Sequence, residues 1–177
     1  MKLPALVLSF CLAAIGPAAL AQSAQTQARA TERIQKEVRH ELVMLPFLDV
    51  FDNLAYRVDG STVTLMGQVT NPTLKTDAGR VVQGIEGVEH VDNQIEVLPV
   101  SPMDDRLRRQ LFHAIYDYPP LEKYAMGVIK PIRIVVKNGN VTLAGVVDND
   151  TDKNIAGVRA NSVAGIFSVT NNLQVSK

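Results

Sequence analysis

The side chains of this chain that are best suited to bind a metal or carry a reaction are three histidines, His40, His90 and His113. A zinc site needs several histidine, cysteine or carboxylate ligands close together, and these three do not form such a cluster, so we expect partly exposed structural histidines. The sequence also has no G-x-S-x-G, H-E-x-x-H, G-x-x-x-x-G-K-[ST] or G-x-G-x-x-G motif. It therefore predicts no catalytic residue, no metal ligand and no cofactor, and indicates a protein that is not an enzyme.

Acidic residues alternate with other polar residues from Asp148 to Asp152, a spacing that suits calcium. The run lacks the glycine and the closing glutamate of an EF-hand loop. Capping of a following helix by Asp148 or Asp150 explains these residues without an ion.

One segment interleaves aromatic, aliphatic and cationic side chains, a pattern typical of the surface of an anionic membrane. The candidate contacts with lipid or a partner are Arg106, Arg109, Tyr118, Lys123, Tyr124, Met126, Lys130 and Arg133. An alternative interpretation places Tyr118, Leu121 and Ile129 in a core and leaves the cations as ordinary solvated surface. The sequence does not decide between the two interpretations.

The elements that must position these residues follow a predicted signal peptide over residues 1–21. Lys2, an apolar run and Ala19-Leu-Ala21 form its three parts. The apolar run is shorter than the roughly 20 residues of a membrane-spanning helix, so we expect no transmembrane segment in the mature chain. The only cysteine, Cys11, lies inside the signal peptide, which leaves the mature chain without disulfides or a lipid anchor. Residues 22–30 are polar and are predicted to form a flexible leader.

The rest of the chain is an internal repeat, because the stretch from Asp59 to Asn71 returns between Asn138 and Asn149. Residues 32–98 hold six basic and eleven acidic residues, whereas residues 101–177 hold ten basic and seven acidic ones. The copies therefore differ in charge, −5 against +3, which would favour contact between them.

Each copy has the same periodicities: a helix, two strands around an Asx-Gly turn, a second helix and a last strand. The fold class is α+β, with two tandem small αββαβ domains, each a three-stranded sheet with two helices on one face. Turns or close backbone contacts are expected at the repeated glycines, which are Gly60, Gly67, Gly87, Gly139, Gly145 and Gly165.

The repeated pattern is an opening helix, V-T-L-x-G-x-V after an Asx-Gly turn, and G-V-x-x-V-x-N-x-[IL]-x-V. It resembles the BON domain, named for bacterial OsmY and nodulation proteins. The resemblance covers residues 31–98 and 103–177, with residues 99–102 as linker. A signal peptide followed by two such domains is similar to the periplasmic OsmY-type proteins. The second copy departs from the pattern by five extra residues in the segment 121–131.

The resemblance implies a non-enzymatic protein of the periplasm that binds anionic phospholipid surfaces or envelope proteins, in envelope maintenance or osmotic stress. A holdase-type chaperone for envelope proteins is the alternative, and a structural stress protein that acts through its abundance is a third reading. Nucleic acid is not an expected partner, since the chain has a pI near neutrality. The sequence does not predict the oligomeric state.

Overall fold

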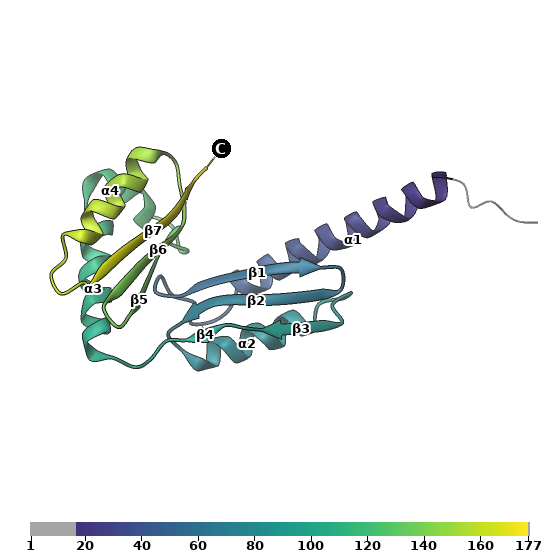
Figure 1. Ribbon diagram of the computed structural model, residues 1–177, viewed down its shortest axis with the longest axis horizontal. Helices are drawn as coiled ribbons and strands as arrows, with labels where there is room; N and C mark the ends of the chain where they lie inside the picture. Colours follow the sequence, from purple (N-terminus) through teal and green to yellow (C-terminus); the bar gives the residue numbers. More distant parts are fainter. Residues whose placement is uncertain (1–16, 177) are drawn as a thin grey trace, which may run out of the picture.

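The computed structural model describes residues 17–176, with side chains from residue 25 onward, and it contains two α+β domains (Figure 1). The first domain consists of α1 (Pro17–Val43), β1 (Asn53–Asp59), β2 (Thr62–Val69), α2 (Pro72–Gln83), β3 (His90–Asn93) and β4 (Glu96–Val97). The second consists of α3 (Pro102–Tyr116), the 3-10 helix η1 (Pro119–Ala125), β5 (Ile132–Lys137), β6 (Asn140–Val147), α4 (Asp150–Asn161) and β7 (Ser168–Val175). The predicted fold class is confirmed.

Both sheets have the same topology. β1 and β2 form an antiparallel hairpin, and β3 and β4 pair in parallel with β2; the second sheet has the order β5-β6-β7 with the same directions. In each domain the two helices and the sheet enclose one apolar core. The paired helices bury their apolar faces against the same side of the sheet, as the helical period predicts.

The last strand of the first domain is divided into β3 and β4, so the first sheet has four strands and not the predicted three. The division follows Asn93, whose side chain turns toward α2. Its Oδ1 accepts a hydrogen bond from the backbone N–H of Ile95 (3.3 Å) and its Nδ2 donates to the carbonyl of Lys75 (2.8 Å). Asn171 in β7 makes the equivalent bonds, to Leu173 and to the carbonyl of Lys153 in α4, but β7 remains continuous.

Residues 22–30 are helical, which differs from the predicted flexible leader. Helix α1 begins at Pro17 and reaches Val43 without a break, and the side chains of residues 25–30 are exposed. No glycine or further proline interrupts this stretch, and its alanines and glutamines favour helix, so the packed half of α1 propagates toward the N-terminus. Residues 1–16 lie outside the described residues, and the signal peptide over 1–21 therefore stays a prediction.

All six glycines of the repeated motif have positive φ. Gly67 (φ 113°) and Gly145 (φ 116°) lie in β2 and β6 with their backbones against the neighbouring strand segment. A Cβ at Gly67 would overlap the carbonyl oxygen of Asn53, and one at Gly145 would overlap that of Pro131. The hairpins can close at these positions only because the side chain is absent.

The helix caps agree in part with the sequence. Asn71 caps α2 and Ser101 caps α3, in agreement with the preference of helix N-termini for Asn and Ser. At α4, however, the cap is Asn149 and not Asp148 or Asp150, because the Oδ1 of Asn149 accepts the backbone N–H of Asp152 (2.8 Å).

The loop between α1 and β1 packs against the second domain. Val50 is 5% exposed and belongs to the core of the second domain, where Phe51 also packs, with its ring edge against Phe112 (centroids 6.5 Å apart). The backbone N–H of Ile134 in β5 donates to the carbonyl of Val50 (2.9 Å). The first domain therefore supplies part of the second domain's core.

Candidate functional site at the domain junction

The predicted contact residues Lys123 and Tyr124 belong to a polar network within the second domain, in which Tyr124 is buried and the side chain of Lys123 is 45% exposed. Lys123 Nζ lies 2.7 Å from carboxylate oxygens of both Asp148 and Asp152. The buried Tyr124 hydroxyl donates to Asp152 Oδ2 (2.6 Å) and accepts from the backbone N–H of Asp148 (2.8 Å). The hydrogen bond from Lys123 lowers the pKa of Asp152. The charge of Lys123 thus holds η1 against the start of α4.

Two further groups of predicted residues lie elsewhere. Tyr118 is half-buried, with the guanidinium of Arg159 4.8 Å above its ring. Arg106 and Arg109 lie on the exposed side of α3, and within the described residues neither has an ion-pair partner. They remain available to an anionic surface.

The remaining predicted residues, Met126, Lys130 and Arg133, lie in or next to the junction of the domains. Lys130 Nζ donates to the carbonyls of Ala125 (2.6 Å) and Gly127 (2.7 Å), which closes the loop after η1. Arg133 Nη1 donates to the carbonyl of Asp49 in the first domain (2.8 Å). Met126 is exposed. The structure therefore brings together two of the predicted cations at the place where the domains meet.

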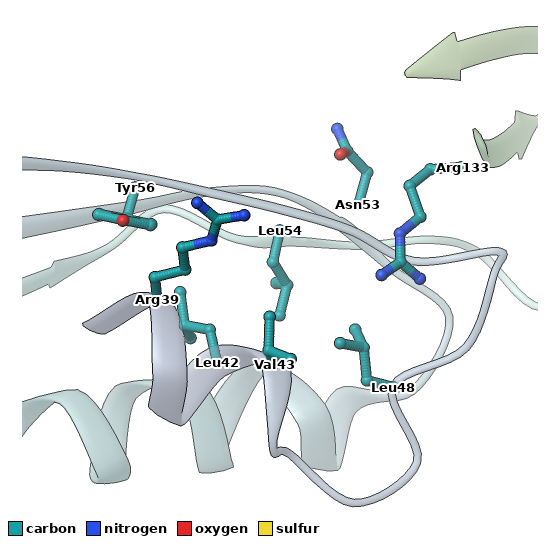
Figure 2. A pocket seen from close by; sticks show the side chains of 8 residues that line it. All are labelled: Arg39, Leu42, Val43, Leu48, Asn53, Leu54, Tyr56 and Arg133. Carbon is teal, nitrogen blue, oxygen red and sulfur yellow. The ribbon is translucent and has the colours of Figure 1, made fainter. Parts of the chain in front are cut away.

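A groove of about 350 Å³ opens at this junction, between α1, β1 and β5 (Figure 2). We call it the junction groove, and its lining residues are Arg39, Leu42, Val43, Leu48, Asn53, Leu54, Tyr56 and Arg133. Figure 2 shows Leu54 between the guanidinium groups of Arg39 and Arg133, with the other apolar side chains beneath them. An apolar floor with a cation on either side suits an amphipathic anion.

A second hollow of similar volume, about 350 Å³, continues from the groove and shares Val43, Leu48 and Arg133 with it. It adds side chains from both domains, namely Leu45, Asp49, Val50, Phe112, Val128, Ile129 and Lys130. Across the two hollows, three cations (Arg39, Lys130 and Arg133) face one lining carboxylate, that of Asp49. The local charge is therefore positive although α1 and β1 belong to the acidic domain.

Apolar side chains project from the two loops that line these hollows. Met44 and Phe47 follow α1, and Met126 and Val128 follow η1; all four are exposed. Phe47 is 75% exposed and has a positive φ of 69°, which is rare for a bulky residue and costs of order 1 kcal/mol. A strained backbone that holds an aromatic ring in water is a feature that points to binding.

A buried carboxylate fixes the loop that carries Phe47. Asp52 is 0% exposed, and its Oδ1 accepts hydrogen bonds from the backbone N–H (2.7 Å) and the hydroxyl (2.9 Å) of Thr70 at the end of β2. Its Oδ2 accepts from the backbone N–H of Asp49 (2.9 Å). These three bonds fix the loop from the first domain, while the bonds of Asp49 and Val50 to β5 fix it from the second.

Other chemistry is not assembled in the part of the chain that the structure describes. Among residues 17–176, no group of three His, Cys, Asp or Glu side chains could hold a metal ion. No helix over the same residues is long and apolar enough to cross a bilayer.

The structure is that of a tandem-domain protein, with two repeated α+β units and a cationic, apolar groove between them. The chain belongs to the BON-domain family, whose model matches residues 30–99 and 121–177. The predicted family is thus confirmed, and the second match begins after α3, at the start of the longer 121–131 segment. BON domains are non-catalytic binding domains, often linked to phospholipid and to the cell envelope.

No curated protein matches this chain significantly. A distant likeness exists to a solved structure of CdsD, a structural protein of the type III secretion system of Chlamydia trachomatis, with 12% identity and a TM-score of 0.29 over 82% of this chain and 94% of that one. A second structure, of the C-terminal domain of CdsD, has 14% identity and a TM-score of 0.28 over 80% and 96% of the two chains. Similarities this low carry no conclusion about function.

Proposed function

We propose that this protein is exported to the periplasm and binds anionic phospholipid surfaces of the cell envelope through the junction groove. The observation that carries the proposal is the pair of guanidinium groups, of Arg39 and Arg133, on either side of an apolar floor. A phospholipid headgroup carries its negative charge next to apolar chains, so one site must offer both kinds of contact.

The cations of the groove differ in their burial and in whether they already have a hydrogen-bond partner. Arg133 is half-buried, and burial lowers its pKa, although an arginine stays protonated at any physiological pH. Arg39 is exposed and has no partner among the described residues. Arg39 is therefore the residue whose replacement changes binding with the least effect on the fold.

The exposed apolar side chains supply the second half of the contact. Phe47 and Val128, from opposite domains, can enter the headgroup region while Arg39 and Lys130 remain near the phosphates, in the manner of residues at a membrane interface. Each cation near an anionic surface contributes about 1 kcal/mol. Three such cations predict a moderate, reversible affinity and not permanent anchoring.

The test is vesicle flotation of the mature chain, from Gln22 onward, with liposomes of phosphatidylglycerol or cardiolipin against phosphatidylcholine, at low and high salt. We expect binding to the anionic vesicles that weakens with salt. Reversing one cation removes its attraction and adds repulsion, so Arg39→Glu should lower the partition coefficient by roughly tenfold. Phe47→Ser should weaken binding at every salt concentration.

Arg57→Glu is the matched control, because Arg57 is exposed on β1 but lies outside the groove. Arg106→Glu with Arg109→Glu tests the exposed side of α3. Binding that survives Arg39→Glu and Phe47→Ser but fails in the α3 variant would assign the contact to α3. Equal losses in the Arg57 control would show a general charge effect and would refute the groove.

The exposed apolar loops also favour a second candidate function, a holdase-type chaperone for envelope proteins, because Met44, Phe47 and Val128 could contact an unfolded chain. Suppression of aggregation of an unfolded client should persist at high salt, whereas headgroup binding is screened. Salt-resistant holdase activity without vesicle binding would replace the lipid proposal.

A further inference from the structure

Strand β7 forms an open edge of the second sheet (Figure 1). It pairs with β6 in one constant register from Ser168 to Val175, and no described strand pairs along its other side. The backbone N–H of Ser176 donates to the carbonyl of Val147 (2.8 Å), so even-numbered residues face β6 and odd-numbered residues face outward. Among the backbone groups that face outward, the N–H of Leu173 donates a hydrogen bond to Asn171 Oδ1 (3.3 Å).

Apart from the bonded N–H of Leu173, this edge lacks the features that usually prevent strands from pairing between molecules. β7 contains no charged residue and no proline, and its register with β6 has no bulge. The equivalent edge of the first domain is protected in two ways. It is divided into β3 and β4, and Asp92 and Glu96 occupy the positions that Thr170 and Gln174 occupy in β7. The two domains therefore differ: the edge of the first sheet is protected against pairing, and the edge of the second sheet is not.

We infer that two copies of this chain associate through their β7 strands, paired antiparallel about a two-fold axis at Asn172, to form one six-stranded sheet. In this register Thr170 faces Gln174 of the partner subunit, twice, and Asn172 faces Asn172 of the partner subunit. These neutral polar side chains can hydrogen-bond across the pair.

The same register explains why the occupant is a second copy. A two-fold pair of first-domain edges would place Asp92 opposite a second Glu96, twice, and like charges directly opposite each other are destabilising. Replacement of both acids by neutral residues at the matching positions of β7 removes this repulsion. In an isologous contact the edge meets a copy of itself, so any charge on it would face a like charge. A contact with an unrelated strand imposes no such requirement.

Disulfide formation tests the register, because the mature chain from Gln22 onward contains no cysteine. Since odd residues make the interstrand hydrogen bonds, Asn172 and its counterpart form a non-hydrogen-bonded pair, with Cα atoms about 4.5 Å apart. A disulfide spans roughly 4.4–6.8 Å between Cα atoms. Asn172→Cys should therefore form a disulfide dimer under mild oxidation, whereas Thr151→Cys, on the exposed start of α4, should not. Equal rates in the two variants would overturn the register.

Sedimentation equilibrium of the mature chain tests the association itself. We expect a reversible dimer, and Thr170→Asp with Gln174→Glu, which restores the charges of the first domain's edge, should raise its dissociation constant by roughly tenfold or more. Thr151→Asp with Gln110→Glu adds the same charges on exposed helix positions and should leave the dimer intact. Circular dichroism checks that each variant is folded. A monomer at every concentration, or a dimer that the β7 variant leaves unchanged, would overturn the inference.

Discussion

Replacement of Val50 by alanine should destabilise the second domain, although Val50 belongs to the chain of the first. Its side chain is 5% exposed and lies in the cluster formed by α3, β5 and α4. The carbonyl of Val50 accepts the N–H of Ile134, and this backbone bond survives the substitution. The change therefore removes side-chain packing alone.

The expected magnitude follows from the deleted groups. Val50→Ala removes two methyl groups, worth about 0.8 kcal/mol each when buried. The cavity that remains adds a further penalty because neighbours such as Phe51 and Phe112 relax only in part, for a total of about 2 kcal/mol. A loss of this size increases the unfolded fraction of the second domain by roughly 30-fold.

Hydrogen exchange resolved along the chain is the appropriate assay, because it separates the two domains. Exchange should accelerate in α3, β5 and β6 by about the calculated free energy, while α2 and β2 change less. Val100→Ala, at a position that is 95% exposed, serves as the control and should change neither domain. Faster exchange confined to the first domain, or no change in either, would refute the view that Val50 completes the second core.

Three other substitutions test separate parts of the structure. Gly145→Ala would overlap the carbonyl of Pro131 and should cost more than about 2 kcal/mol, measured by thermal unfolding. Burial raises the pKa of Tyr116 from 10.0, so the folded state retains this proton and stability falls as the pH rises above 10.0; urea titrations of Tyr116→Phe should show a weaker alkaline loss. The pKa of Asp152 is lowered, so pH acts on stability in the opposite direction: the stabilisation by this carboxylate is lost as the pH falls through the lowered pKa. Asp152→Asn should therefore be less stable near neutrality and less sensitive to acid, unless the contact with Lys123 contributes nothing.

Much of the fold could be predicted because its signals are local and were present twice. The Asx-Gly turns, the alternating strands and the glycines at 67 and 145 each imply a backbone conformation independent of distant partners. The helix over residues 22–30 was not predicted, because polar Ala/Gln-rich sequence has no apolar period and its helicity depends on propagation from the packed half of α1.

The binding surface was predicted less well than the fold. Lys130 and Arg133 were found, because cations next to aliphatic residues are visible in sequence. Lys123 and Tyr124 belong to the same kind of sequence pattern, but they bond to Asp152 of the same domain. Only the tertiary structure reveals these contacts. Arg39 was missed, since its partner in the groove, Arg133, comes from the other domain and lies far along the chain.

The shared core at Val50 and Phe51 also determines the order in which the parts of this protein can complete their folding. Arg133, which bonds to the carbonyl of Asp49, is 84 residues further along the chain, and Phe112 and Ile134 are similarly late. Whenever the first domain folds before the rest of the chain is available, its α1–β1 loop must hold two apolar side chains in water until the second domain arrives. Folding is thus completed from the C-terminal side, and a chain that is truncated before β5 would leave these apolar side chains exposed and become prone to aggregation and proteolysis.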